Sequence, residues 1–96
     1  MKDDPRTVIE NIRRHILEHE PEKAIEGAQM LLEIMSEKKI HCSSNAVEEI
    51  FNALYYLREA DRDHSLRDDV RQKHIDCALR SLGVIWDALA QWSEKA

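Results

Sequence analysis

The sequence contains few residues that break helices or cross-link a chain. Its 96 residues include two glycines, two prolines and two cysteines. Both glycines, Gly27 and Gly83, fall inside helical patterns, so no glycine-rich loop is available to hold a phosphate, and nucleotide binding by the usual motifs is excluded. Cys42 and Cys77 form no spaced framework of the kind that stabilises small secreted domains, so we expect two thiols in a reducing compartment.

Long apolar runs and an excess of positive charge are also missing. No run approaches the roughly 18 apolar residues of a membrane span, and the first residues, MKDDPRTV, include no apolar segment of the signal-peptide kind. The chain has 14 lysines and arginines against 19 aspartates and glutamates, a net charge of -5, which disfavours contact with a phosphate backbone. We therefore expect a cytoplasmic protein with no membrane contact, no direct DNA binding and no cofactor.

Helical periodicity runs through the whole chain. Apolar residues recur at spacings of three and four, and no segment alternates strictly over the length of a strand. A chain of this length can bury one core of modest size. Because short connections favour antiparallel neighbours, we predict an all-α, antiparallel up-and-down four-helix bundle, a single domain over residues 1–96 with a long C-terminal helix.

Capping residues, prolines and apolar stripes give the expected limits and inward faces of the four helices. The expected starts are Asp4 with Pro5, Pro21, Asn45 with Glu48, and Leu66, and the second and fourth helices are expected to end near Lys39 and Ser93. The expected inward residues are Val8, Ile9, Ile12 and Ile16; Ala24, Ile25, Ala28, Leu31, Leu32 and Met35; Ala46, Val47, Ile50, Leu54 and Leu57; and Ile75, Ala78, Leu82, Ile85, Trp86 and Leu89.

A group of polar residues is expected at one end of this bundle. Near the start of the fourth helix, Arg67, Arg71 and His74 project close to the inward direction. The antiparallel topology brings the end of the first helix, with His15 and His19, to the same end of the bundle. We therefore predict that these five side chains converge.

The stretch RDDVRQKH, Arg67 to His74, resembles the arginine, polar residue, spacer and histidine motif of the HEPN family of helical proteins. The resemblance covers eight residues, with Asp68 as the polar residue. It implies a helix-bundle dimer that cleaves RNA, in which His74 takes part in proton transfer and Arg67 holds phosphate charge. Such roles suit an imidazole that titrates near neutrality and a guanidinium that binds phosphate as a fork.

A metal site is a second alternative for the same region. His15 with His19, and His74 with Cys77, have spacings that allow two ligands on one helix to reach one ion. Arginines nearby would repel a cation, so half-buried or surface histidines are the competing interpretation. We predict no metal.

Apolar residues outside the inward stripes predict an interface with another protein. Met30 and Ile34 lie off the stripe of the second helix, Phe51 and Tyr55 form a flank of the third, and Trp92 stands near the end of the fourth. These side chains either complete a broad core within the chain or pack against a second molecule. We predict the latter: a small acidic, non-enzymatic interaction or regulatory protein that forms a homodimer and binds another protein with a basic surface.

Overall fold

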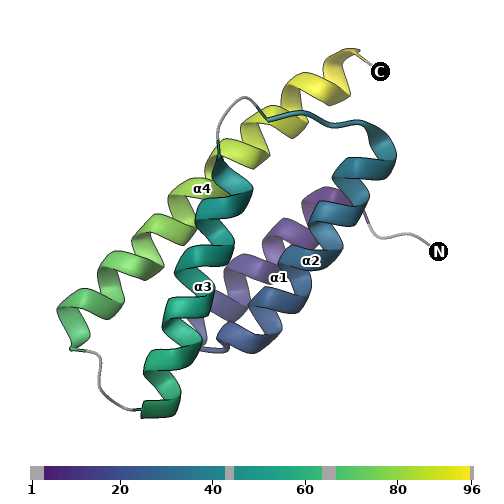
Figure 1. Cartoon of the computed structure of the whole chain (residues 1–96). Coiled ribbons are helices and arrows are strands. Elements are labelled where there is room, and N and C mark those ends of the chain that lie inside the picture. The colour runs from purple at the N-terminus through teal and green to yellow at the C-terminus, as the bar shows by residue number, and fades with distance from the viewer. Residues whose placement is uncertain (1–3, 43–44, 64–66, 96) are drawn as a thin grey trace.

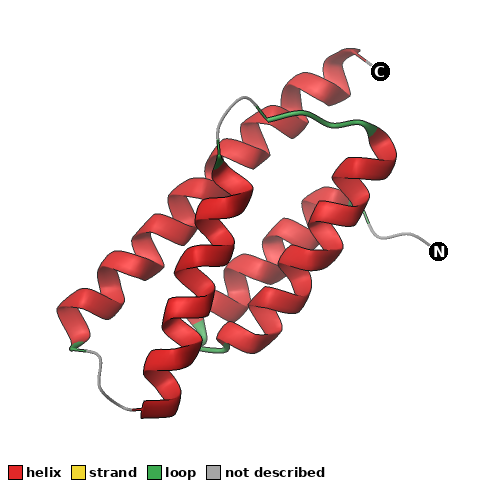
Figure 2. Ribbon diagram, viewed as in Figure 1, coloured by secondary structure: helices red, strands yellow, loops and turns green. Residues whose placement is uncertain are grey.

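The chain folds into four helices that run alternately up and down. The computed structural model describes the backbone of residues 4–42, 45–63 and 67–95, which form α1 (Pro5–Leu17), α2 (Pro21–Lys38), α3 (Ala46–Asp63) and α4 (Asp68–Lys95) (Figure 1). No strand occurs in this part of the chain (Figure 2). At 28 residues, α4 is the longest helix, and its C-terminal turns extend past the other three. The predicted all-α antiparallel bundle with a long C-terminal helix is confirmed.

Local capping chemistry sets the ends of the first two helices. The Asp4 carboxylate accepts a hydrogen bond from the backbone N–H of Arg6 at 3.3 Å, and prolines occupy the first turns of α1 and α2, as predicted. Both helices end at a residue in the left-handed conformation, His19 (φ 60°) and Lys39 (φ 56°). At each end the next N–H bonds back to a carbonyl five residues earlier, which closes the turn. These left-handed turns stop α1 and α2 without glycine.

One core fills the space between the helices. Each helix packs against two others, α1 against α2 and α4, and α3 against α2 and α4. The most deeply buried large side chains come from all four helices: Ile12, Leu31, Ile50, Leu54, Ile85 and Leu89. Among the described residues, no helix is long and apolar enough to cross a membrane.

The second helix buries nearly the face that its sequence predicts, with Ile34 in the core in place of Leu32. Ile34 is 6% exposed and belongs to the core, whereas Leu32 is 48% exposed. The helices α1 and α2 also pack closely at Gly27. A side chain there would start 2.7 Å from Cγ1 of Ile12, so the absence of a side chain lets α1 approach α2. Because Ile34 is buried, the prediction that it faces a partner is wrong.

The fourth helix buries five of its six predicted inward residues and packs most extensively against α3. Ser81, which is buried, donates a hydrogen bond from Oγ to the Glu49 carboxylate of α3 at 3.1 Å. Trp86, expected in the inward stripe, is 36% exposed on the side of α1. The bundle therefore consists of two closely packed hairpins, α1 with α2 and α3 with α4, and α1 and α4 make the least extensive contact.

Candidate functional site

The five residues of the predicted polar cluster occupy several separate sites. His19 and Arg71 line one small hollow, which Asp61 of α3 also lines. Arg71 forms an ion pair with Asp61, a partner that the sequence analysis did not identify. His15 does not line this hollow, and its Nδ1 lies 3.2 Å from the carboxylate of Glu20. His19 and Arg71 thus come together as expected, and the wider convergence is not seen.

The two residues that resemble the HEPN motif are also engaged separately. Arg67 precedes α4, is exposed, and holds Asp69 through two hydrogen bonds of 3.0 and 3.2 Å. His74, in α4, stacks on the ring of Tyr56 in α3, with 4.1 Å between ring centroids. Each side chain therefore has its own partner, and the contacts give no sign of one shared site.

Potential metal ligands gather at only one place in the described part of the chain. Donor atoms of His15, Glu18 and Glu20 lie within 4.8 Å of one another where α1 turns into α2. The spacing of His15 and His19 does not place both on one helix, because α1 ends at Leu17 and His19 lies in the left-handed turn. Lys23 also places its ammonium 3.0 Å from the Glu20 carboxylate, so a cation already neutralises one member of the group.

Glu20 is held in its charged form by these neighbours. Hydrogen bonds from Lys23 and then from His15 lower the pKa of Glu20 from 4.5 to about 2. Because the folded-state pKa lies below the unfolded one, this carboxylate stabilises the fold fully above about pH 4.5. That contribution is lost as the pH falls toward 2.

We therefore expect Glu20→Gln to lower the melting temperature at pH 7 and to leave it nearly unchanged near pH 2. Thermal unfolding followed by circular dichroism at several pH values measures the difference. Glu26→Gln, at an exposed position of α2, is the matched control, and its effect on the melting temperature should not depend on pH. An equal loss from Glu20→Gln at both pH values would mean that the charge of Glu20 is not what stabilises this turn.

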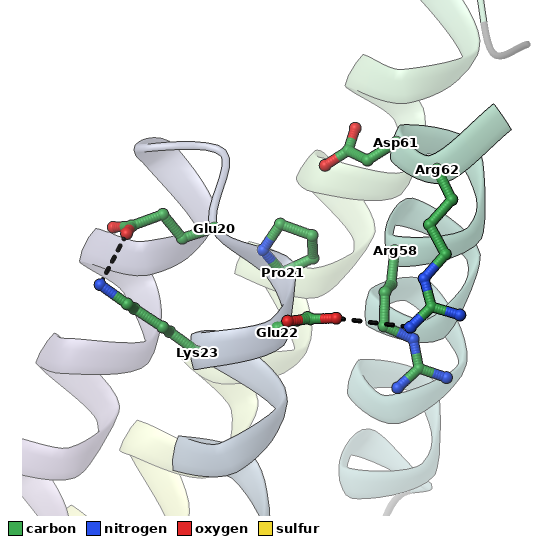
Figure 3. Close-up of a pocket in the computed structure, with 7 residues that line it drawn as sticks. All are labelled: Glu20, Pro21, Glu22, Lys23, Arg58, Asp61 and Arg62. Atoms are coloured by element: carbon green, nitrogen blue, oxygen red, sulfur yellow. Dashed lines mark hydrogen bonds and ion pairs between the residues drawn. The ribbon is translucent and has the colours of Figure 1, made fainter. Parts of the chain in front are cut away.

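A second hollow, of about 360 Å³, separates the start of α2 from the end of α3 (Figure 3). Its lining residues are Glu20, Pro21, Glu22, Lys23, Arg58, Asp61 and Arg62. Glu22 pairs with Arg62 at 3.5 Å across the hollow, and the guanidinium of Arg58 lies 5.1 Å from the centre of the Tyr55 ring. Three cationic and three anionic side chains line this site, so it favours no ligand of a single charge.

The predicted interface residues differ in how much surface they present. Met30 and Tyr55 are 43% and 39% exposed, and Phe51 is half-buried with its ring stacked against Tyr55. Ile34 is buried, as described above, and the side chain of Trp92 lies outside those that the structure describes. Met30 borders the seam between α1 and α2, while Phe51 and Tyr55 belong to α3.

A hollow of about 700 Å³ lies along the seam between α1 and α4. We call it the α1/α4 groove, and it is lined by Ile9, Glu10, Arg13, Leu79, Arg80, Leu82, Gly83, Val84, Trp86 and Asp87. Ile9 and Leu82 belong to the core, while Val84 and Trp86 are 39% and 36% exposed. The guanidinium of Arg6 lies 6.0 Å from the centre of the Trp86 ring, a cation–π contact at the edge of this site.

Four charged side chains around the α1/α4 groove have no ionic partner among the residues that the structure describes. Glu10 and Arg13 of α1 and Arg80 and Asp87 of α4 form no ion pair within the described ranges. The groove therefore combines exposed apolar side chains with two cations and two anions that are available to a partner. The sequence does not predict the α1/α4 groove, because Trp86 fits the inward stripe of α4. The one signal available was Gly83, in the middle of an otherwise regular helix.

The fold and this groove define the class of protein as an antiparallel four-helix bundle with an open seam. No family model, no curated protein and no solved structure matches the chain.

Proposed function

We propose that the chain is a non-enzymatic, protein-binding bundle that works as a homodimer. The observation that supports this proposal is the α1/α4 groove, where Val84 and Trp86 remain exposed beside a floor of core residues. Covering apolar surface is favourable by roughly 25 cal/mol per Å². Tryptophan in a pocket rimmed by polar groups is typical of the residues that dominate binding energy.

Charge and cysteine usage complete the proposal. The net charge of -5 would attract a further partner with a basic surface and would raise its rate of association. Cys42 and Cys77 are not joined to each other, which is compatible with a reducing compartment such as the cytoplasm. The ribonuclease alternative gains no support from the contacts of Arg67 and His74 described above.

Light scattering on the separated protein over a range of concentrations tests the homodimer directly. We expect the mass of two chains, and we expect Trp86→Ala to weaken association at least about tenfold, which corresponds to about 1.4 kcal/mol. Leu32→Ala is the matched control, since Leu32 is also exposed but belongs to α2. A single chain up to concentrations on the order of 1 mM would contradict the homodimer.

A second measurement tests the non-enzymatic part of the proposal. The protein and its His74→Ala variant are incubated with mixed RNA under the same conditions. We expect no difference between them. RNA cleavage by the wild type that is lost in His74→Ala would make the proposed function wrong and the resemblance to the HEPN motif meaningful.

A further inference from the structure

We infer that a second copy of the chain occupies the α1/α4 groove, with the two α4 helices antiparallel and a two-fold axis between Gly83 and Val84. This inference rests on the proposed homodimer and assigns its interface. It follows from three features of the groove: a glycine without a neighbour, charges without partners, and exposed apolar side chains beside both.

No close contact within the described part of the chain requires a glycine at position 83. A glycine inside a helix destabilises it by roughly 0.5–1 kcal/mol relative to alanine, because glycine loses more backbone freedom on folding. At Gly27 the close approach of Ile12 explains the glycine, whereas a side chain at Gly83 would meet nothing within 4 Å. A second helix backbone that approaches α4 at this point gives Gly83 the role that Gly27 has against α1.

The charges of α4 are arranged so that the helix complements a copy of itself. Arg80 lies three residues before Gly83, and Asp87 lies three residues after Val84. Around an axis between Gly83 and Val84, an antiparallel copy therefore brings Arg80 opposite the partner's Asp87. Two-fold symmetry repeats this pair, so one surface forms two ion pairs with itself.

These two side chains cannot satisfy each other within one chain. Seven residues of helix separate them, a rise of roughly 10 Å, and neither has an ionic partner in the described part of the structure. Glu10 and Arg13 add one anion and one cation to the same rim. The rim is therefore balanced although the chain as a whole is acidic, which favours a copy of this chain over a partner of one sign.

The same two-fold axis would bury the apolar side chains of the groove against the second copy. Val84 faces the partner's Gly83, so the exposed side chain on one helix fills the space that the missing side chain leaves on the other. Trp86 and Leu79 flank this contact on the side of α1. The two seams between α1 and α4 would then close against each other.

Charge reversal on α4 tests the pairing. In the R80E variant both α4 contacts become acid against acid, and in D87R both become base against base. We expect each variant alone to dissociate at least about tenfold more readily than the wild type at low ionic strength. An equimolar mixture should recover the two-chain mass, because every contact in a mixed dimer again joins opposite charges.

Two further variants separate an interface effect from a folding effect. The double variant R80E/D87R should restore the homodimer within one chain. Gly83→Gln should weaken the dimer while circular dichroism shows helix content at least equal to that of the wild type, since the site is open in the single chain.

The outcomes separate this interface from the proposed function. If the wild type is a dimer and neither charge reversal weakens it, the α4 pairing is wrong. The homodimer then forms through another surface, such as that of Phe51 and Tyr55. If both variants dissociate and their mixture stays monomeric, the antiparallel register is wrong. A monomeric wild type would overturn the homodimer and this interface together.

Discussion

Replacing Leu54 by alanine is expected to lower the free energy of unfolding by about 2–5 kcal/mol, the range for large-to-small changes in closely packed cores. Leu54 has no exposed surface. It lines one small hollow together with residues of the other three helices: Ile16 of α1, Pro21 of α2 and Ile75 of α4. The cavity left by the change therefore cannot be filled by a shift of one helix without loss of contact to another.

Urea unfolding followed by circular dichroism measures this loss of free energy. If the slope of that free energy against urea concentration is unchanged, the folded and unfolded states are the same in both proteins. In a domain of this size, the change should reduce the melting temperature by roughly 10 °C or more. Leu32→Ala is the control, because Leu32 is 48% exposed and should change stability by no more than about 0.5 kcal/mol. Similar losses from both variants would show that Leu54 is not at the centre of the core.

Alanine at the two glycines is expected to have opposite effects. At Gly27 the new methyl group would start 2.7 Å from Cγ1 of Ile12, a residue with no exposed surface. Overpacking of this kind costs about 1–3 kcal/mol, which outweighs the gain of up to about 1 kcal/mol from better helix propensity. We expect Gly27→Ala to destabilise the bundle and to push α1 away from α2.

Gly83→Ala is the matched control and should stabilise the single chain by about 0.5–1 kcal/mol, since its new methyl group meets nothing within 4 Å. Urea unfolding at low protein concentration, where single chains dominate, measures both variants. Stabilisation by Gly27→Ala would contradict the close approach of α1 and α2. Destabilisation by Gly83→Ala in the single chain would mean that the surface around Gly83 is not open.

Secondary structure and topology could be predicted because they depend on local signals. Asp4, Pro5 and Pro21 act on backbone groups within one turn, and the apolar spacing of α1 and α3 identifies their buried faces correctly. The C-terminal end of α1 could not be predicted in the same way. No glycine marks the turn, so the left-handed conformation of His19 has no signal in the sequence.

The exact rotation of α2 and α4 about their own axes could not be predicted, because it depends on contacts with helices far away in the sequence. Gly27 lets Ile12 of α1 approach α2, and the hydrogen bond of Ser81 to Glu49 joins α4 to α3. Ile34 is buried and Leu32 and Trp86 are exposed, which differs from the apolar stripes that the sequence predicts. For the same reason Asp61 could not be identified as the partner of Arg71.

The division into two hairpins has a consequence for how the chain folds and opens. Contacts within α1–α2 and within α3–α4 join segments that are close in the sequence, so they require little loop closure and are expected to form early. The contact of α1 with α4 joins the two ends of the chain and is the least extensive. This seam is then the first to separate during local unfolding, and a molecule bound across it would restrain the termini and slow the opening of the whole bundle.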